Sequence, residues 1–86
     1  MPKKIAPRIV SLEVAKLLRN ERMRRGISIR RLASMAGLSQ PMVGYVERGM
    51  RNPTLDTVLR IANALDVDLS GLIKQASRSR RRTKVS

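Results

Sequence analysis

The stretch GISIRRLASMAGLSQPMVGYVERG, residues 26–49, decides the fold of this chain. It contains two short segments of helical pattern, and each follows a serine that can cap a helix N-terminus, Ser28 and Ser39. Gly37 closes the first segment and Gly49 the second, which is where glycine is expected, just past a helix end. Helices of about two turns are unstable alone, so both segments must pack against the rest of the chain.

The spacing of apolar residues gives each segment an inner face. Leu32, Ala33 and Ala36 share one face of the first segment, and Val43 and Val46 share one face of the second. Two short helices joined by a tight turn form the helix-turn-helix arrangement, in which the second helix presents its N-terminal residues to the edges of DNA bases. The sequence therefore predicts a recognition helix from Ser39 to about Arg48.

Three further helical segments flank this pair. The first is predicted from Ser11, as its N-cap, to Arg25; another follows Thr54 with a strong apolar stripe; a short last helix starts at about Asp68. No strand pattern competes, and aliphatic residues dominate the core. The predicted fold is therefore all-α, a compact five-helix bundle.

The charge of the chain is strongly basic and concentrated at its ends. Of 86 residues, 19 are Lys or Arg and 6 are Asp or Glu, which gives a net charge of +13. Residues 1–10 and 77–86 contain no acid and are predicted to be disordered basic tails, which leaves 11–76 as the folded domain. Such a balance favours a polyanionic partner.

Several classes of function are disfavoured by what the sequence lacks. There is no Cys and no His, which argues against disulfides, the usual zinc ligands, thiol nucleophiles and imidazole bases. We expect no catalytic residue, no metal and no cofactor, and an enzyme is the weakest hypothesis. The N-terminus has no apolar signal region and no run is long enough to span a membrane, so a cytoplasmic, nucleoid-associated protein is expected.

From about residue 12 to residue 74, the chain resembles the lambda-repressor/Cro-like helix-turn-helix proteins, the XRE family of transcriptional regulators. The stretches that carry the resemblance are Leu32-Ala33, the turn AGLS at 36–39, VGYVERG at 43–49, RNP at 51–53 and LDTVLRIANALDVDLSGLI at 55–73. Each is weak by itself, but their order and spacing are specific.

The resemblance implies a set of structural residues. Ala33 must be small so that the two short helices can cross closely, and Val43 and Val46 anchor the recognition helix. It also pairs Arg22 with Glu47. The residues themselves favour a partly buried ion pair over two solvated charges, because both lie beside apolar core positions.

The resemblance also assigns DNA contacts. The positions expected to read bases are Gln40, Pro41, Gly44 and Tyr45. A glutamine can bond adenine in a bidentate manner, and a glycine can allow close approach of the backbone. The candidates for contacts to the DNA backbone are Ser28, Arg30, Arg31, Arg48, Arg51 and Asn52. Ile29 departs from the family pattern, which usually has a phosphate-contacting glutamine there.

The leading hypothesis is a sequence-specific transcriptional regulator, expected to be a repressor, that binds double-stranded DNA as a homodimer with half-sites about one helical turn apart. The candidate dimer surface comprises Leu69, Leu72, Ile73 and the end of the fourth helix. We expect no small-molecule effector domain. Two alternatives stay open: an antitoxin or adaptor with a protein partner, and a non-specific nucleic-acid-binding protein driven by its tails.

Overall fold

The computed structural model describes residues 6–50 and 52–84, except for the side chains of 79–84. Over these residues the chain forms five helices and no strand, so the prediction of an all-α, five-helix bundle is confirmed. The helices are α1 (Pro7–Arg24), α2 (Ile29–Ala36), α3 (Gln40–Glu47), α4 (Leu55–Ala64) and α5 (Leu69–Lys84).

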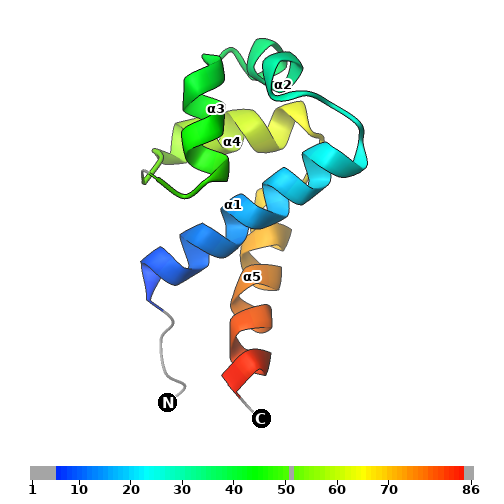
Figure 1. Cartoon of the computed structure of the whole chain (residues 1–86). Coiled ribbons are helices and arrows are strands. Elements are labelled where there is room, and N and C mark those ends of the chain that lie inside the picture. Colours follow the sequence, from blue (N-terminus) through cyan, green and yellow to red (C-terminus); the bar gives the residue numbers. More distant parts are fainter. Residues whose placement is uncertain (1–5, 51, 85–86) are drawn as a thin grey trace.

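The long helix α1 crosses the middle of the molecule and separates its two ends (Figure 1). α2, α3 and α4 lie on one side of it, where α2 packs against both α3 and α4. α5 packs against α1 and then extends away from the α2–α3 end. All five helices contribute to one aliphatic core, whose most deeply buried large side chains are Leu18, Leu32, Ile61, Leu65 and Val43.

Side-chain caps and one glycine set the ends of the three short central helices, α2, α3 and α4. The hydroxyls of Ser28, Ser39 and Thr54 accept hydrogen bonds from backbone amides in the first turns of α2, α3 and α4, at 3.0, 3.2 and 3.1 Å. Gly37 ends α2 with φ of 70°, a left-handed conformation that an L side chain would strain. These local signals place the turn between α2 and α3 where the sequence predicts it.

The predicted start of the first helix is wrong. Ser11 does not cap it, because α1 begins four residues earlier at Pro7 and its N-cap, Ala6, makes no side-chain cap hydrogen bond. Proline is tolerated at the first helical position, where its missing N–H would have no intrahelical partner. Val10 packs against the core, so burial extends the helix into the predicted N-terminal tail.

The predicted length of the last helix is also wrong. α5 starts beside Asp68 as expected, but it continues to Lys84 rather than ending after a few turns. Ala76 is fully buried, and arginine and lysine are good helix formers, so the helix runs into the predicted C-terminal tail. The other residues of the two predicted tails, 1–5 and 85–86, lie outside the described residues. Within the part that the structure describes, no helix is long and apolar enough to cross a membrane.

Candidate nucleic-acid interface

The inner face of α3 fixes the orientation of this helix. Val43 and Val46 are 0% and 3% exposed and belong to the same core cluster as Leu32 and Ala33 of α2. Because residues three apart share a helix face, the residues between these two valines and before them point to other sides. α3 is therefore anchored along one side only.

An ion pair joins the C-terminal end of α3 to α1. Arg22 bonds Glu47 in a bidentate manner, from Nε to Oε2 at 2.7 Å and from Nη2 to Oε1 at 3.0 Å. Its Nη1 donates to the carbonyl oxygen of Ile27 at 2.7 Å. The two side chains are only 12% and 3% exposed, so the sequence-based expectation of a partly buried pair describes this geometry. The pair fixes the rotation of α3 as well as its position.

The outer face of α3 holds the four residues expected to read bases. Gln40 and Pro41 are exposed, and Tyr45 is half-buried. The guanidinium carbon of Arg48 lies 5.7 Å from the centroid of the Tyr45 ring, so a cation stacks against the aromatic side chain. Gly44, the fourth, shares this face by its spacing from Gln40 and Arg48.

Gly44 differs from its neighbours because it is buried. Its covering is the side chain of Arg48, whose guanidinium lies directly over it. This contact was not part of the sequence-based prediction, which treated Gly44 as a site of close approach to DNA. The signal that could have indicated it is the i, i+4 spacing of glycine and arginine on one helix face.

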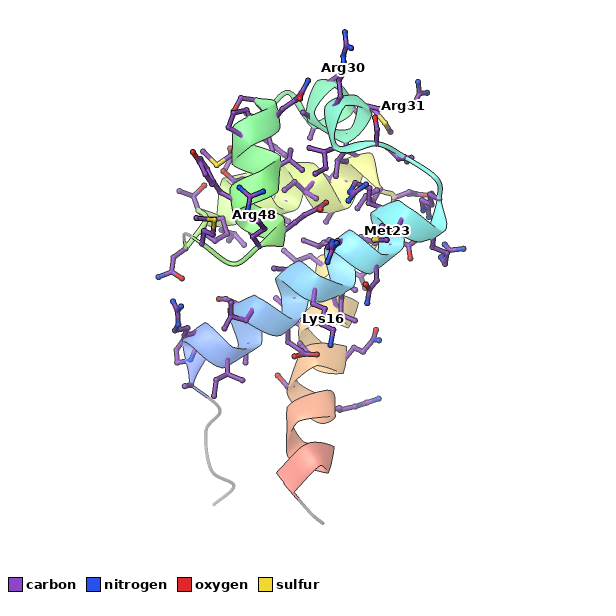
Figure 2. All side chains as sticks on the ribbon, viewed as in Figure 1. Lys16, Met23, Arg30, Arg31 and Arg48 are labelled. Carbon is purple, nitrogen blue, oxygen red and sulfur yellow. The ribbon has the colours of Figure 1, made fainter. Side chains whose placement is uncertain are left out.

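The candidates for DNA-backbone contacts are more scattered. Arg30 and Arg31 are exposed and project from α2, at the end of the molecule opposite α5, whereas Arg48 lies along α3 (Figure 2). The hydroxyl of Ser28 caps α2 by accepting a hydrogen bond from the backbone amide of Arg31. Asn52 is exposed but lines an apolar pocket beside α1. Arg51 lies outside the described residues.

The substitution of Ile29 for the usual glutamine has a structural counterpart. Ile29 is half-buried and packs against the core cluster. An apolar side chain there stabilises the start of α2 but offers no donor to a phosphate. The isoleucine side chain therefore cannot itself make the polar contact that the family pattern places at this position.

Comparison with known proteins assigns this chain to a family. A helix-turn-helix family model (HTH_3) matches residues 18–72, well over half of the chain. The chain belongs to this helix-turn-helix family. The resemblance to XRE-type regulators that the sequence motifs indicate is thereby confirmed.

Proteins related to this helix-turn-helix protein are named as transcriptional regulators. An HTH-type transcriptional regulator of Mycobacterium tuberculosis is 39% identical over 59 residues, which are 69% of this chain and 42% of the relative. The HTH-type transcriptional regulator SutR of Escherichia coli is 41% identical over 56 residues, 65% of this chain and 32% of SutR. The chain thus spans less than half the length of these curated relatives.

Among solved structures, the restriction-modification controller protein C.AhdI of Aeromonas hydrophila is similar over nearly its whole length. It superposes with a TM-score of 0.67 and 37% sequence identity, covering 79% of this chain and 98% of C.AhdI. The family match at 18–72 includes every candidate site residue of the helix-turn-helix, from Arg22 to Asn52.

The charges around the helix-turn-helix leave its outer surface without an acid. Between Ser28 and Arg48 the only carboxylate is Glu47, which is buried and paired with Arg22. The exposed charges on α2 and at the C-cap of α3 are therefore those of Arg30, Arg31 and Arg48. A surface of one sign attracts an anionic partner, and the phosphates of DNA carry the opposite sign.

Outside this surface, Glu21 on α1 is held by two arginines. It accepts hydrogen bonds from Arg24 at 2.5 and 3.1 Å and from Arg25 at 2.7 Å. These bonds, first from Arg24 and then from Arg25, lower the pKa of the Glu21 carboxyl from 4.5 to about 2. These ion pairs link the last turn of α1 and its C-cap to the Glu21 carboxylate.

We expect the Glu21 carboxyl to titrate near pH 2 in an NMR titration of the folded protein. Since the folded-state pKa lies below the unfolded value, the stabilising contribution is complete above about pH 4.5 and disappears as the pH falls toward 2. The variant Arg24→Ala/Arg25→Ala should return the pKa toward its ordinary value. An unchanged pKa in that variant would show that the two arginines are not the cause.

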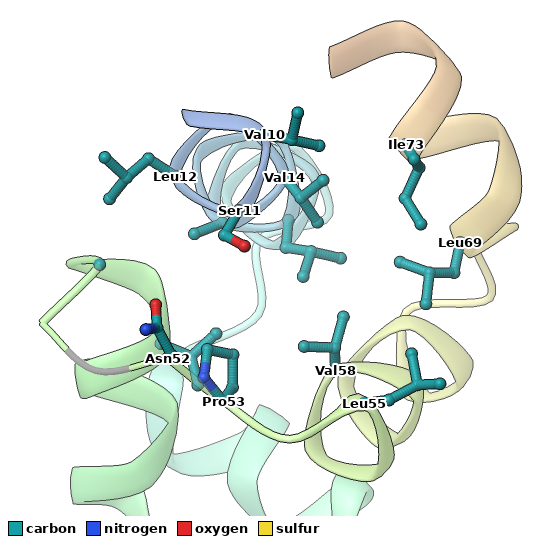
Figure 3. Close-up of a pocket in the computed structure, with 14 residues that line it drawn as sticks. Val10, Ser11, Leu12, Val14, Asn52, Pro53, Leu55, Val58, Leu69 and Ile73 are labelled. Carbon is teal, nitrogen blue, oxygen red and sulfur yellow. The ribbon is translucent and has the colours of Figure 1, made fainter. Parts of the chain in front are cut away.

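An apolar pocket of about 270 Å³ opens between α1, the α3–α4 loop, α4 and α5 (Figure 3). Ile73 and Leu69 line it from α5, and Val58 and Leu55 line it from α4. Leu55 is 66% exposed and Ile73 is 41% exposed, as is Leu12 on α1. Part of the dimer surface expected from the sequence thus borders this pocket, although Leu69 itself is buried.

Proposed function

We propose that this helix-turn-helix protein is a sequence-specific transcriptional regulator that places α3 in the major groove of double-stranded DNA. The observation that carries this proposal is the division of α3 into two faces. One face is fixed by Val43, Val46 and the Arg22–Glu47 pair, and the other carries exposed Gln40 and Pro41 and has no acid. A helix held rigidly along one side can present the other side in a fixed register to base edges.

The exposed residues of α3 suit direct readout. Gln40 at the N-terminal end can bond the N6 and N7 atoms of an adenine. Pro41 has no donor and can contact only a thymine methyl group. Tyr45, one turn further, can reach a base edge or a phosphate with its hydroxyl. Arg30 and Arg31 on α2 supply the charge for phosphates beside the groove.

We further propose that the protein binds as a homodimer. One such module offers few base contacts, so two half-sites are needed for specificity. Leu55 and Ile73 are exposed and line the pocket, and their burial against a second copy would stabilise the dimer. A bound dimer would act as a repressor by occupying promoter DNA in the cytoplasm. The names of the relatives support the regulatory role.

Selection of bound sites from random duplex DNA, at about 150 mM salt, tests the proposal because non-specific binding weakens steeply with salt. The wild-type protein should enrich a palindromic sequence. The variant Gln40→Ala/Tyr45→Ala should lose that enrichment while keeping its circular dichroism spectrum, since both side chains lie outside the core cluster.

Gln75→Ala is the matched control, because Gln75 is an exposed glutamine on α5, away from α3. It should select the same palindrome as the wild type. If the wild type enriches no sequence and its binding vanishes as salt rises, the protein is a non-specific nucleic-acid binder and the proposal fails.

A further inference from the structure

The backbone conformation at Gly44, in the middle of α3, does not require a glycine. Gly44 has an ordinary helical conformation, unlike Gly37 and Gly49, whose φ values are positive. A glycine inside a helix costs about 0.5–1 kcal/mol relative to alanine. In a helix of only eight residues that cost needs another explanation, and the side chain that covers Gly44 supplies it.

That side chain belongs to Arg48, one turn later. Side chains on a helix lean toward its N-terminus, so the side chain of Arg48 runs back over residue 44. A Cβ atom on Gly44 would lie 3.1 Å from Nη1, 3.5 Å from Nη2 and 3.6 Å from the guanidinium carbon. Three such similar distances mean that the guanidinium rests on the helix surface at Gly44, where an added methyl group would crowd it.

Two further contacts hold the guanidinium in place. The Tyr45 ring lies at 5.7 Å from its carbon to the ring centroid, and Nε donates to the sulfur of Met50 at 3.2 Å. The remaining nitrogens, Nη1 and Nη2, donate no hydrogen bond to another residue in the described part of the chain. Arg48 thus presents two free donors, in a fixed plane, on the same helix face as Gln40.

We propose that Arg48 is a specificity-determining residue that reads a guanine in the major groove, and that Gly44 is the seat which orients it. Guanine presents two acceptors there, O6 and N7, and the arginine fork matches them in a bidentate contact. This inference rests on the proposed function. It moves Arg48 from the expected backbone contacts to the base-reading group and gives Gly44 an indirect, positioning role.

A phosphate contact would not need this arrangement. Phosphate is bound well by an arginine that extends freely from a helix end, and such a contact carries no sequence information. Here the side chain instead turns back along the helix and lies against Tyr45, on the surface proposed to enter the groove. A fixed plane is useful for a planar base edge, which restricts the angle of approach.

The test uses the DNA site that the wild-type protein selects, with 7-deazaguanine replacing guanine at one position of both half-sites at a time. This base pairs normally but lacks the N7 acceptor. At one position the substitution should weaken wild-type binding about tenfold, because each of the two half-sites loses one bond of its bidentate contact. The same substitution should cost the variant Arg48→Ala nothing. Arg19→Ala, which removes an exposed arginine of α1, should behave as the wild type does.

Gly44→Ala tests the positioning role of Gly44 without removing the charge of Arg48, because it keeps the arginine and displaces its guanidinium. It should reduce the 7-deazaguanine penalty without lowering the melting temperature. In the free protein, the ring-current shift that Tyr45 imposes on the Arg48 side chain should diminish, which NMR can measure even if DNA binding is lost. A penalty and a shift that both stay at wild-type size would refute the role of the seat.

The result that would overturn the role of Arg48 is different from a failure of the proposed function. If Arg48→Ala weakens all DNA sequences equally and lowers the slope of affinity against salt by about one, Arg48 contacts a phosphate. The protein then remains a sequence-specific regulator with a different reader. If the wild type selects no sequence, both the proposed function and this inference fail.

Discussion

Replacing Glu47 with alanine should lower the free energy of unfolding by about 3 kcal/mol, because the change leaves the guanidinium of Arg22 buried without its counter-ion. Arg22 is 12% exposed and would keep only its bond to the carbonyl of Ile27. Denaturation by urea, with the slope of the transition compared between variants, measures the loss.

Glu21→Ala is the control for this prediction, because Glu21 also pairs with arginine but does so at the surface. Exposed ion pairs contribute little, so the effect should be much smaller. The double variant Arg22→Ala/Glu47→Ala should recover part of the stability lost in Glu47→Ala, since it removes the unpaired charge. Equal losses for Glu47→Ala and Glu21→Ala would mean that the buried pair is not a structural anchor of α3.

Ala33→Leu should destabilise the fold by up to about 3 kcal/mol through overpacking. Ala33 is 3% exposed and belongs to the core cluster of Val43 and Val46, where α2 packs against α3. The added carbons have no space, so α3 must move outward or the side chain must adopt a strained rotamer. Thermal unfolding followed by circular dichroism measures the change.

Ser34→Leu is the matched control for this substitution. It adds a leucine to the neighbouring position of the same helix, where the side chain is exposed, so the melting temperature should change little. A wild-type melting temperature for Ala33→Leu would contradict the close crossing of α2 and α3. A variant that folds normally but loses DNA selection would place the effect on the orientation of α3 alone.

The central helices α2, α3 and α4 are predicted well from the sequence, because the signals that set their ends are local. The serine and threonine caps and Gly37 set the ends of α2, α3 and α4 through hydrogen bonds and backbone conformations that involve only near neighbours in sequence. The inner face of α3 follows from apolar spacing alone, since a helix repeats every 3.6 residues. The family motifs add Glu47 and its partner, which are far apart in sequence.

The ends of the molecule were predicted less well. Pro7 is a residue type that can start a helix, but composition predicted disordered tails up to residue 10 and after residue 76. In the described residues α1 includes Val10, which packs on the core, and α5 continues past the fully enclosed Ala76 to Lys84. Whether an apolar residue near a chain end finds a partner depends on helices that are distant in sequence, and propensity does not contain that information.

Sequence by itself thus determined the helix-turn-helix, its family and the face of α3 that looks outward. The tertiary structure alone decided how far α1 and α5 extend and how the pocket forms between them. The physical reason is the range of the interactions. Caps, turns and periodicity act over about one helical turn and can be read along the chain, whereas packing and side-chain stacking depend on which surfaces meet in space.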